Sequence, residues 1–195
     1  MPGFPPRHYL MTLTQGLRQV SWIVLFPLAL ISALITHNLT LLFYTHVMAA
    51  VLWTGSDIFL GILLGPILST LPPSARKPLL TRLFPKVFWI LPISAATTGT
   101  AGWFLAHWLG DWTSRMLTAP LDIAILITSL LTFQGFGLLL PTNYRIYRML
   151  QSADAPTPAQ QQALQQHMRV YKIGVQIQAI AQFAIVFVMA TIATH

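Results

Sequence analysis

The sequence predicts an all-α, polytopic membrane protein, a bundle of five transmembrane helices with a four-helix core and one N-terminal helix. Three observations predict this fold. Of the 195 residues, 55% are hydrophobic and only 8% are charged, whereas roughly a quarter of an ordinary soluble domain is charged. The apolar residues gather into five long stretches. The lysines and arginines lie between these stretches, almost all of them where one side of a membrane would be.

The five apolar stretches approach or reach the roughly 17 to 25 residues that a membrane span needs. They cover residues 20–36, 41–67, 87–109, 117–140 and 173–193, which leaves a single membrane domain. The first stretch is the shortest, and Arg18 before a short apolar run is also typical of a signal peptide. Because no small-residue cleavage site follows Ile35, an uncleaved helix is favoured.

A polar, proline-bearing segment precedes the last span. Thr157, Pro158 and Gln160 there have the order of a helix start, with a capping residue, a proline in the first turn and a glutamine able to return a hydrogen bond. The sequence therefore predicts a helix over about residues 158–168 that runs along the inside surface into the last span.

The basic residues set the expected orientation. With the N-terminus inside and the C-terminus outside, ten of the eleven lysines and arginines lie inside, and only Arg115 lies outside. The protein is expected in the cytoplasmic membrane of a bacterium. The net charge of +7 then marks topology and contact with lipid head groups, so nucleic acid is not expected as a partner. The absence of cysteine excludes disulfides and thiolate metal sites.

Polar residues within the spans are the candidate functional residues, because ionisable groups are costly in lipid and usually face the bundle interior. In the second span His46, Trp53 and Asp57 follow helical spacing along one stripe. The third span and the fifth span each have one helix face that carries polar or small candidate residues. The fourth span has one carboxyl. These residues are Gly99, Trp103 and His107 on the third span, Asp122 on the fourth, and Gln178 and Gln182 on the fifth.

Two metal sites fit these residues. Histidines on facing helices commonly hold haem, so His46 and His107 are candidate axial ligands of one haem b, with Trp53, Gly99 and Trp103 lining its pocket. The alternative interpretation places His107 in the interfacial belt of tryptophans. Copper is the alternative, because Met48, Met189 and His195 lie on the same outer side as His46.

A third interpretation needs no metal. Asp57, Asp122, Gln178 and Gln182 could relay protons or ions through the bundle. The same residues could equally be hydrogen-bonding contacts that hold the helices together.

The second span, with His46, Trp53 and Gly55, resembles the opening helix of a group of small bacterial membrane proteins. The group comprises the HemJ-type protoporphyrinogen oxidases, the copper-resistance D family and a related family of predicted integral membrane proteins. The chain is similar to the last family at three further segments, which are residues 82–84, 98–99 and 140–145. The resemblance covers most of the chain from about Thr40 onward.

The resemblance implies a functional role for one residue, His46, either in haem association or in copper handling. The HemJ-type enzymes also use a lysine where this chain has Asp122, and a later histidine where it has Gln134. These departures argue against porphyrinogen oxidation.

The leading hypothesis is therefore a haem-b-binding redox or electron-transfer protein, and it includes a quinone as a partner near the outer surface. The alternatives are a copper-handling membrane protein and a non-catalytic accessory subunit of a larger respiratory complex. These residues do not decide whether the chain is an enzyme; if it is one, we expect an oxidoreductase. They also do not decide whether it binds other subunits or copies of itself.

Overall fold

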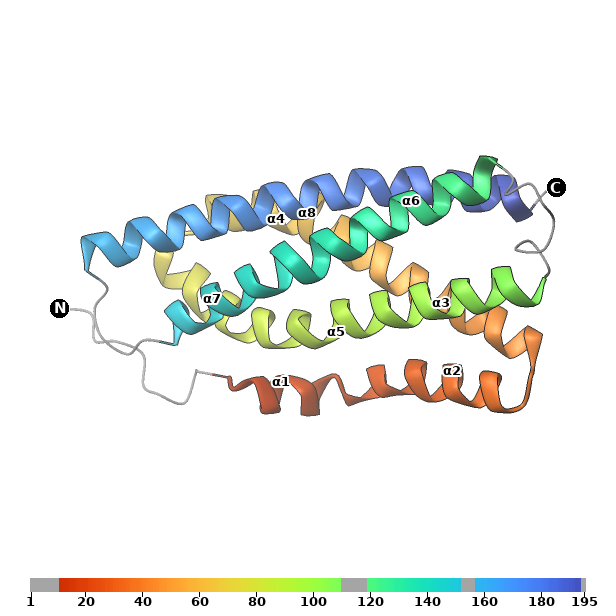
Figure 1. Cartoon of the computed structure of the whole chain (residues 1–195). Coiled ribbons are helices and arrows are strands. Elements are labelled where there is room, and N and C mark those ends of the chain that lie inside the picture. The colour runs from red at the N-terminus through yellow and green to blue at the C-terminus, as the bar shows by residue number, and fades with distance from the viewer. Residues whose placement is uncertain (1–10, 110–118, 152–156, 194–195) are drawn as a thin grey trace.

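The computed structural model of the chain describes residues 11–109, 119–151 and 157–193, and every regular element in these ranges is a helix. The helices run side by side as one elongated bundle (Figure 1). Four are long and apolar enough to cross a membrane, or five if a bent N-terminal pair counts as one span. The predicted all-α helical bundle is confirmed.

Each of the four long spans contains at least 31 residues. The first joins α3 (Leu39–Ile58), the π-helical segment η3 (Phe59–Leu64) and α4 (Gly65–Thr70). The second is α5 (Pro73–Trp108). The third joins α6 (Ala119–Gln134), the π-helical segment η4 (Gly135–Leu139) and α7 (Leu140–Leu150). The fourth is α8 (Pro158–Ala193).

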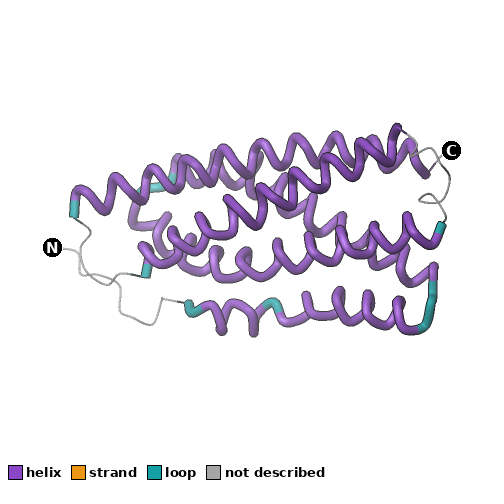
Figure 2. The backbone as a smooth tube through the Cα atoms, viewed as in Figure 1, coloured by secondary structure: helices purple, strands orange, loops and turns teal. Residues whose placement is uncertain are grey.

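The four spans form the core of the bundle. Span α3 packs most extensively against α5, α6 packs against α8, and α8 also contacts α3. Figure 2 shows that the described connections between helices are short. Because α8 contacts both α3 and the α6–α7 span, side chains from three different spans meet near the middle of the bundle.

Two spans extend further than their apolar stretches predict. Helix α5 begins at Pro73 rather than near residue 87, and the fourth predicted span continues through α7 to Leu150; its residues 117 and 118 lie outside the described ranges. These extensions are amphipathic rather than wholly apolar. They bury one side in a second hydrophobic cluster, whose buried members are Leu80, Phe84, Ile146, Tyr147 and Leu150. Hydropathy alone ends a span too early where such a face begins.

The predicted helices over residues 158–168 and 173–193 are one continuous helix, α8. It begins as the sequence predicts, since the Gln160 backbone N–H donates to the Thr157 hydroxyl over 3.3 Å, and the Thr157 N–H donates to the Gln160 side chain over 2.9 Å. Its 36 residues measure about 54 Å at 1.5 Å per residue. Helix α8 is therefore longer than the roughly 30 Å core of a bilayer.

The first predicted span, residues 20–36, is the one that the structure changes most. It consists of the 3₁₀ turn η2 (Ser21–Val24) and α2 (Leu25–Ile35), preceded by α1 (Leu13–Gln19), which is bent from them by 74°. Helix α1 docks on α5, where the Trp89 indole N–H donates to the Leu13 carbonyl over 3.0 Å. Helix α2 is exposed on one side, and on the other Leu30 and Ala33 pack in a hydrophobic cluster with Leu42 of α3 and with Ala101 and Leu105 of α5.

One end of the bundle, here called the basic end, carries the described cationic side chains. It comprises α1, α7 and the first turns of α5 and α8, which lie together on the left of Figure 1. These elements hold Arg18, Arg76, Lys77, Arg82, Lys86, Arg145, Arg148, Arg169 and Lys172. Arg7 and Arg115 lie outside the described residues. The basic end is the end predicted to face the inside.

Candidate functional site

Asp57 lies deep in the bundle and has no exposed surface. It sits in the last turn of α3, 18 residues after Leu39, which places it about 27 Å along the span. The residues around it in sequence are apolar or uncharged. A carboxyl at such a depth is costly unless other groups stabilise it.

Two glutamine amides from α8 stabilise the Asp57 carboxyl. The Gln178 Nε2 donates to Asp57 Oδ2 over 2.5 Å, and the Gln182 Nε2 donates to the same oxygen over 2.8 Å. Both glutamines are buried, and they lie four residues apart, on one face of the helix. The buried Trp53 side chain, one turn before Asp57, also interacts with the carboxyl. We call these four residues the Asp57 cluster.

Three oxygens of the Asp57 cluster are buried without a hydrogen-bond partner. They are Asp57 Oδ1, Gln178 Oε1 and Gln182 Oε1. An unpartnered buried polar atom costs about 1 to 3 kcal/mol, so three of them in one cluster call for an explanation. A bound proton, or a water molecule, would satisfy such oxygens.

Both π-helical segments adjoin the cluster. Segment η3 begins two residues after Asp57, and η4 follows α6 beside Gln178, whose Oε1 lies 3.9 Å from where a side chain on Gly135 would begin. Each segment ends two residues before a proline, Pro66 or Pro141. A proline lacks an N–H and its ring clashes with the carbonyl four residues earlier, so the helix widens there. Short π-helical turns often mark functional sites.

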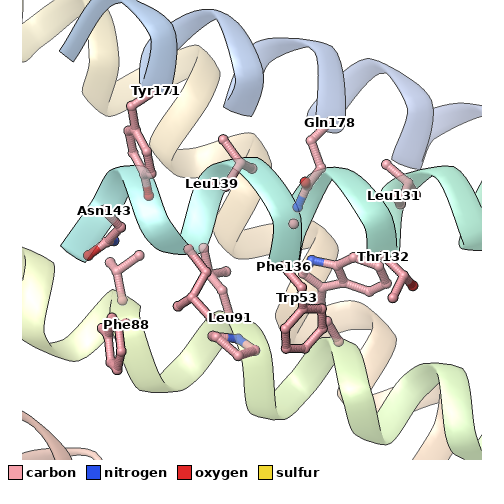
Figure 3. A pocket seen from close by; sticks show the side chains of 15 residues that line it. Trp53, Phe88, Leu91, Leu131, Thr132, Phe136, Leu139, Asn143, Tyr171 and Gln178 are labelled. Carbon is pink, nitrogen blue, oxygen red and sulfur yellow. The ribbon is translucent and has the colours of Figure 1, made fainter. Parts of the chain in front are cut away.

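A partly open cavity adjoins the cluster on the side of the basic end. It has a volume of about 40 Å³, and its lining comes from α3, α5, α6, η4, α7 and α8. Most of the lining is apolar, but the side chains of Trp53 and Gln178 lie toward one end, and those of Asn143 and Tyr171 lie toward the other (Figure 3). The Asn143 amide and the Tyr171 side chain interact with each other.

His46 lies nearer the other end of α3, in the contact between α3 and α5. Its Nδ1 lies 2.9 Å from the Thr98 carbonyl oxygen. Because a carbonyl can only accept, Nδ1 carries the proton and donates it, which leaves Nε2 with a free lone pair. The ring occupies the space beside Gly102, where a Cβ would lie only 2.8 Å from His46 Cε1.

The other predicted haem residues lie apart from His46. His107 and Trp103 are exposed, and among the described residues no neighbouring helix comes within 4 Å of where a Cβ on Gly99 would stand. Gly102 is the residue of α5 that faces His46, and His107 follows five residues later, about 140° further round the helix. The structure therefore does not bring the two histidines together, and a haem held by both stays a prediction.

Some of the remaining predicted residues contact one another in the structure, and others do not. The structure brings Asp57, Gln178 and Gln182 together, whereas Asp122 is exposed near the start of α6 and takes no part. Met48 is exposed, and His195 lies outside the described residues. Within the ranges that the structure describes, no three histidine, cysteine, aspartate or glutamate side chains are placed to hold one metal ion.

Four residues around these sites were not predicted from sequence as site residues. Gly102 makes room for His46, and Asn143 and Tyr171 form the far end of the cavity. Gln134 donates from Nε2 to the Gly174 carbonyl over 2.8 Å and so ties α6 to α8 next to the cluster. A buried amide within a helix indicates a hydrogen bond to another helix. Whether an amide is buried depends on the neighbouring helix, so one helix's sequence does not predict it.

Comparison of the chain with protein-family models, curated proteins and solved structures found no match.

Proposed function

We propose that this chain is an integral membrane protein that takes up and releases protons at Asp57. One observation carries the proposal. A fully buried carboxyl in an apolar span accepts hydrogen bonds on one oxygen and has no partner on the other. Intramembrane carboxyls with this degree of burial are typical of proton and ion pathways.

The uncharged nature of the partners supports proton binding over a fixed charge pair. Helix association alone needs only an uncharged polar residue such as asparagine or glutamine. A carboxyl adds one property, the ability to change charge. Its partners Gln178 and Gln182 are amides, so neither locks Asp57 in the ionised form as a lysine or arginine would.

The same amides serve both protonation states. When Asp57 is ionised, their N–H groups donate to the carboxylate, as the structure has them. When a proton is transferred from hydronium to Asp57, water is released and the new O–H needs an acceptor. Rotation of one glutamine side chain by half a turn presents its Oε1 for this purpose. The cluster thus holds a proton without a large rearrangement of helices.

The direct test is infrared difference spectroscopy of the purified protein across a pH range. We expect carboxylic acid C=O bands to appear as pH falls, and the component contributed by Asp57 to be missing from Asp57→Asn. The matched control is Ser56→Ala, which changes the neighbouring residue and leaves the carboxyl in place. A spectrum in which Asp57→Asn and the wild type show the same carboxylic acid band would overturn the proposal.

We also propose a second function, binding of haem b or another metal through Nε2 of His46. The observation that favours it is the hydrogen bond from Nδ1 to the Thr98 carbonyl together with the space left by Gly102. Metal-ligating histidines usually donate their other N–H to a carbonyl or carboxylate in this way. A bound haem would supply one-electron transfer. The second axial ligand is not assigned.

For His46, we expect the purified protein to show a Soret absorption band that is lost in His46→Ala. Gly102→Val should weaken the band as well, because a side chain there displaces the imidazole. Metal analysis of the same samples distinguishes haem iron from copper. His107→Ala serves as the comparison, since it removes the other predicted ligand. Protein without a Soret band and without bound metal would rule out this second function.

A further inference from the structure

The cavity beside the Asp57 cluster joins two sets of polar side chains within the bundle. Trp53 and Gln178 of the cluster line it at one end, and Asn143 and Tyr171 line it toward the basic end (Figure 3). On α8 the two ends are seven residues apart, from Tyr171 to Gln178, which is about 10 Å. The cavity therefore spans much of the distance between Asp57 and α7.

The lining has the polar groups that water requires. Gln178 Oε1 and Asn143 Oδ1 are both buried and have no hydrogen-bond partner within the chain. Pro92, which also lines the cavity, has no N–H and so leaves the Phe88 carbonyl without its helical donor. All three groups are acceptors, and water has two donors to offer them.

The size of the cavity also fits water. Its volume is about 40 Å³, and a cavity measured in this way needs roughly 10 to 15 Å³ for each water. There is room for about three or four molecules. An empty cavity would leave the buried oxygens unsatisfied.

We infer that this cavity holds a short chain of water molecules that carries protons between the Asp57 cluster and the Asn143–Tyr171 pair. The inference rests on the proposed function of Asp57 and adds the path by which a proton reaches it. A proton accepted by the water nearest Asn143 forms one O–H bond while the next O–H bond along the chain breaks. The last water gives its proton to Asp57, so one proton moves and no other atom is exchanged.

The presence of water is tested first in the full-length, unmodified protein by radiolytic hydroxyl-radical labelling. Radicals form from bound water and oxidise the side chains beside it, so we expect Trp53 to be oxidised although it is buried, and Tyr171 to be oxidised more than its partial exposure explains. Ile146 provides the internal control, because it has no exposed surface and does not line the cavity. Equal, background labelling at Trp53, Tyr171 and Ile146 would overturn the inference.

A second test fills the cavity. Ala95 lines it and Ala96, the next residue, is exposed on the outside of α5. We expect Ala95→Leu to lower both the labelling of Trp53 and the rate of proton uptake into vesicles by about tenfold or more, because the water is displaced. The matched variant Ala96→Leu should change neither. Unchanged uptake in a folded Ala95→Leu protein contradicts the water path.

The outcomes separate this inference from the proposed function. If the infrared spectra contain no Asp57 carboxylic acid band at any pH, the proposed function fails. If Asp57 takes up a proton but Trp53 and Tyr171 stay unlabelled, Asp57 remains the proton-binding group and only the water chain is wrong. Labelling of both residues with a titrating Asp57 supports both.

Discussion

Asp57→Asn is expected to reduce proton uptake by vesicles containing the protein to the level of vesicles without protein. Asparagine has nearly the shape of aspartate, and its oxygen can still accept from Gln178 and Gln182. The helix packing should therefore survive, while the group that binds the proton is lost. The measurement is the internal pH of vesicles, followed with an enclosed dye after a pH or potassium gradient is imposed.

Two further variants make the flux measurement specific. Asp57→Glu restores a carboxyl at nearly the same place and should recover part of the flux. Ser56→Ala alters the neighbouring residue without touching the cluster and should leave the flux unchanged. Wild-type flux in a correctly folded Asp57→Asn protein would mean that protons do not pass through this carboxyl.

Replacing both glutamines with leucine, as Gln178→Leu/Gln182→Leu, is expected to destabilise the bundle strongly. Both side chains are buried and both donate to Asp57 Oδ2. Hydrogen bonds to a charged group contribute about 1.5 to 3 kcal/mol each, and Asp57 would be left buried without these amide donors. We expect the free energy of unfolding in detergent or bicelles to fall by about 3 kcal/mol.

The triple variant, which adds Asp57→Leu, should recover most of this loss. Once the carboxyl is gone, no buried group remains that needs the amides, and apolar side chains of similar size fill the space. Coupling of this kind is the signature of residues in direct contact. If the triple variant is no more stable than the double variant, the glutamines stabilise the bundle by a route that does not involve Asp57.

The two experiments together distinguish a proton-binding cluster from a set of contacts between helices. In a purely structural cluster, Asp57→Asn would alter neither the flux nor the infrared spectrum, although the glutamine variants would still lower stability. In a proton-binding cluster, Asp57→Asn abolishes the flux while the fold remains. The stability measurements thus report the contact, and the flux reports the chemistry.

Much of the cluster is predictable from helical spacing. Trp53 and Asp57 lie four residues apart, as do Gln178 and Gln182, so each pair occupies one face of its own helix. The cost of polar groups in lipid predicts that both faces turn inward. In the structure all four residues are buried.

The histidine pair illustrates what spacing does not predict. His107 follows Trp103 and Gly99 at regular intervals, which suggests one inward face of α5. In the structure the face of α5 that meets His46 carries Thr98 and Gly102 instead, and His107 is exposed. The rotation of a helix about its axis is decided by close packing with its neighbours, which a pattern of small residues in one helix leaves open.

The sequence by itself determined that this is a helical membrane protein, which segments are apolar enough to span, and that Asp57 is a costly residue to keep there. These properties follow from the transfer of side chains into lipid, which depends on composition and spacing within one segment. Only the tertiary structure decided that α8 supplies the partners of Asp57, that two spans widen beside it, and that a cavity extends from Trp53 and Gln178 to Asn143 and Tyr171. These properties depend on which helix lies beside which, and lipid solvates all apolar helices alike, so the detailed fit of their surfaces makes that choice.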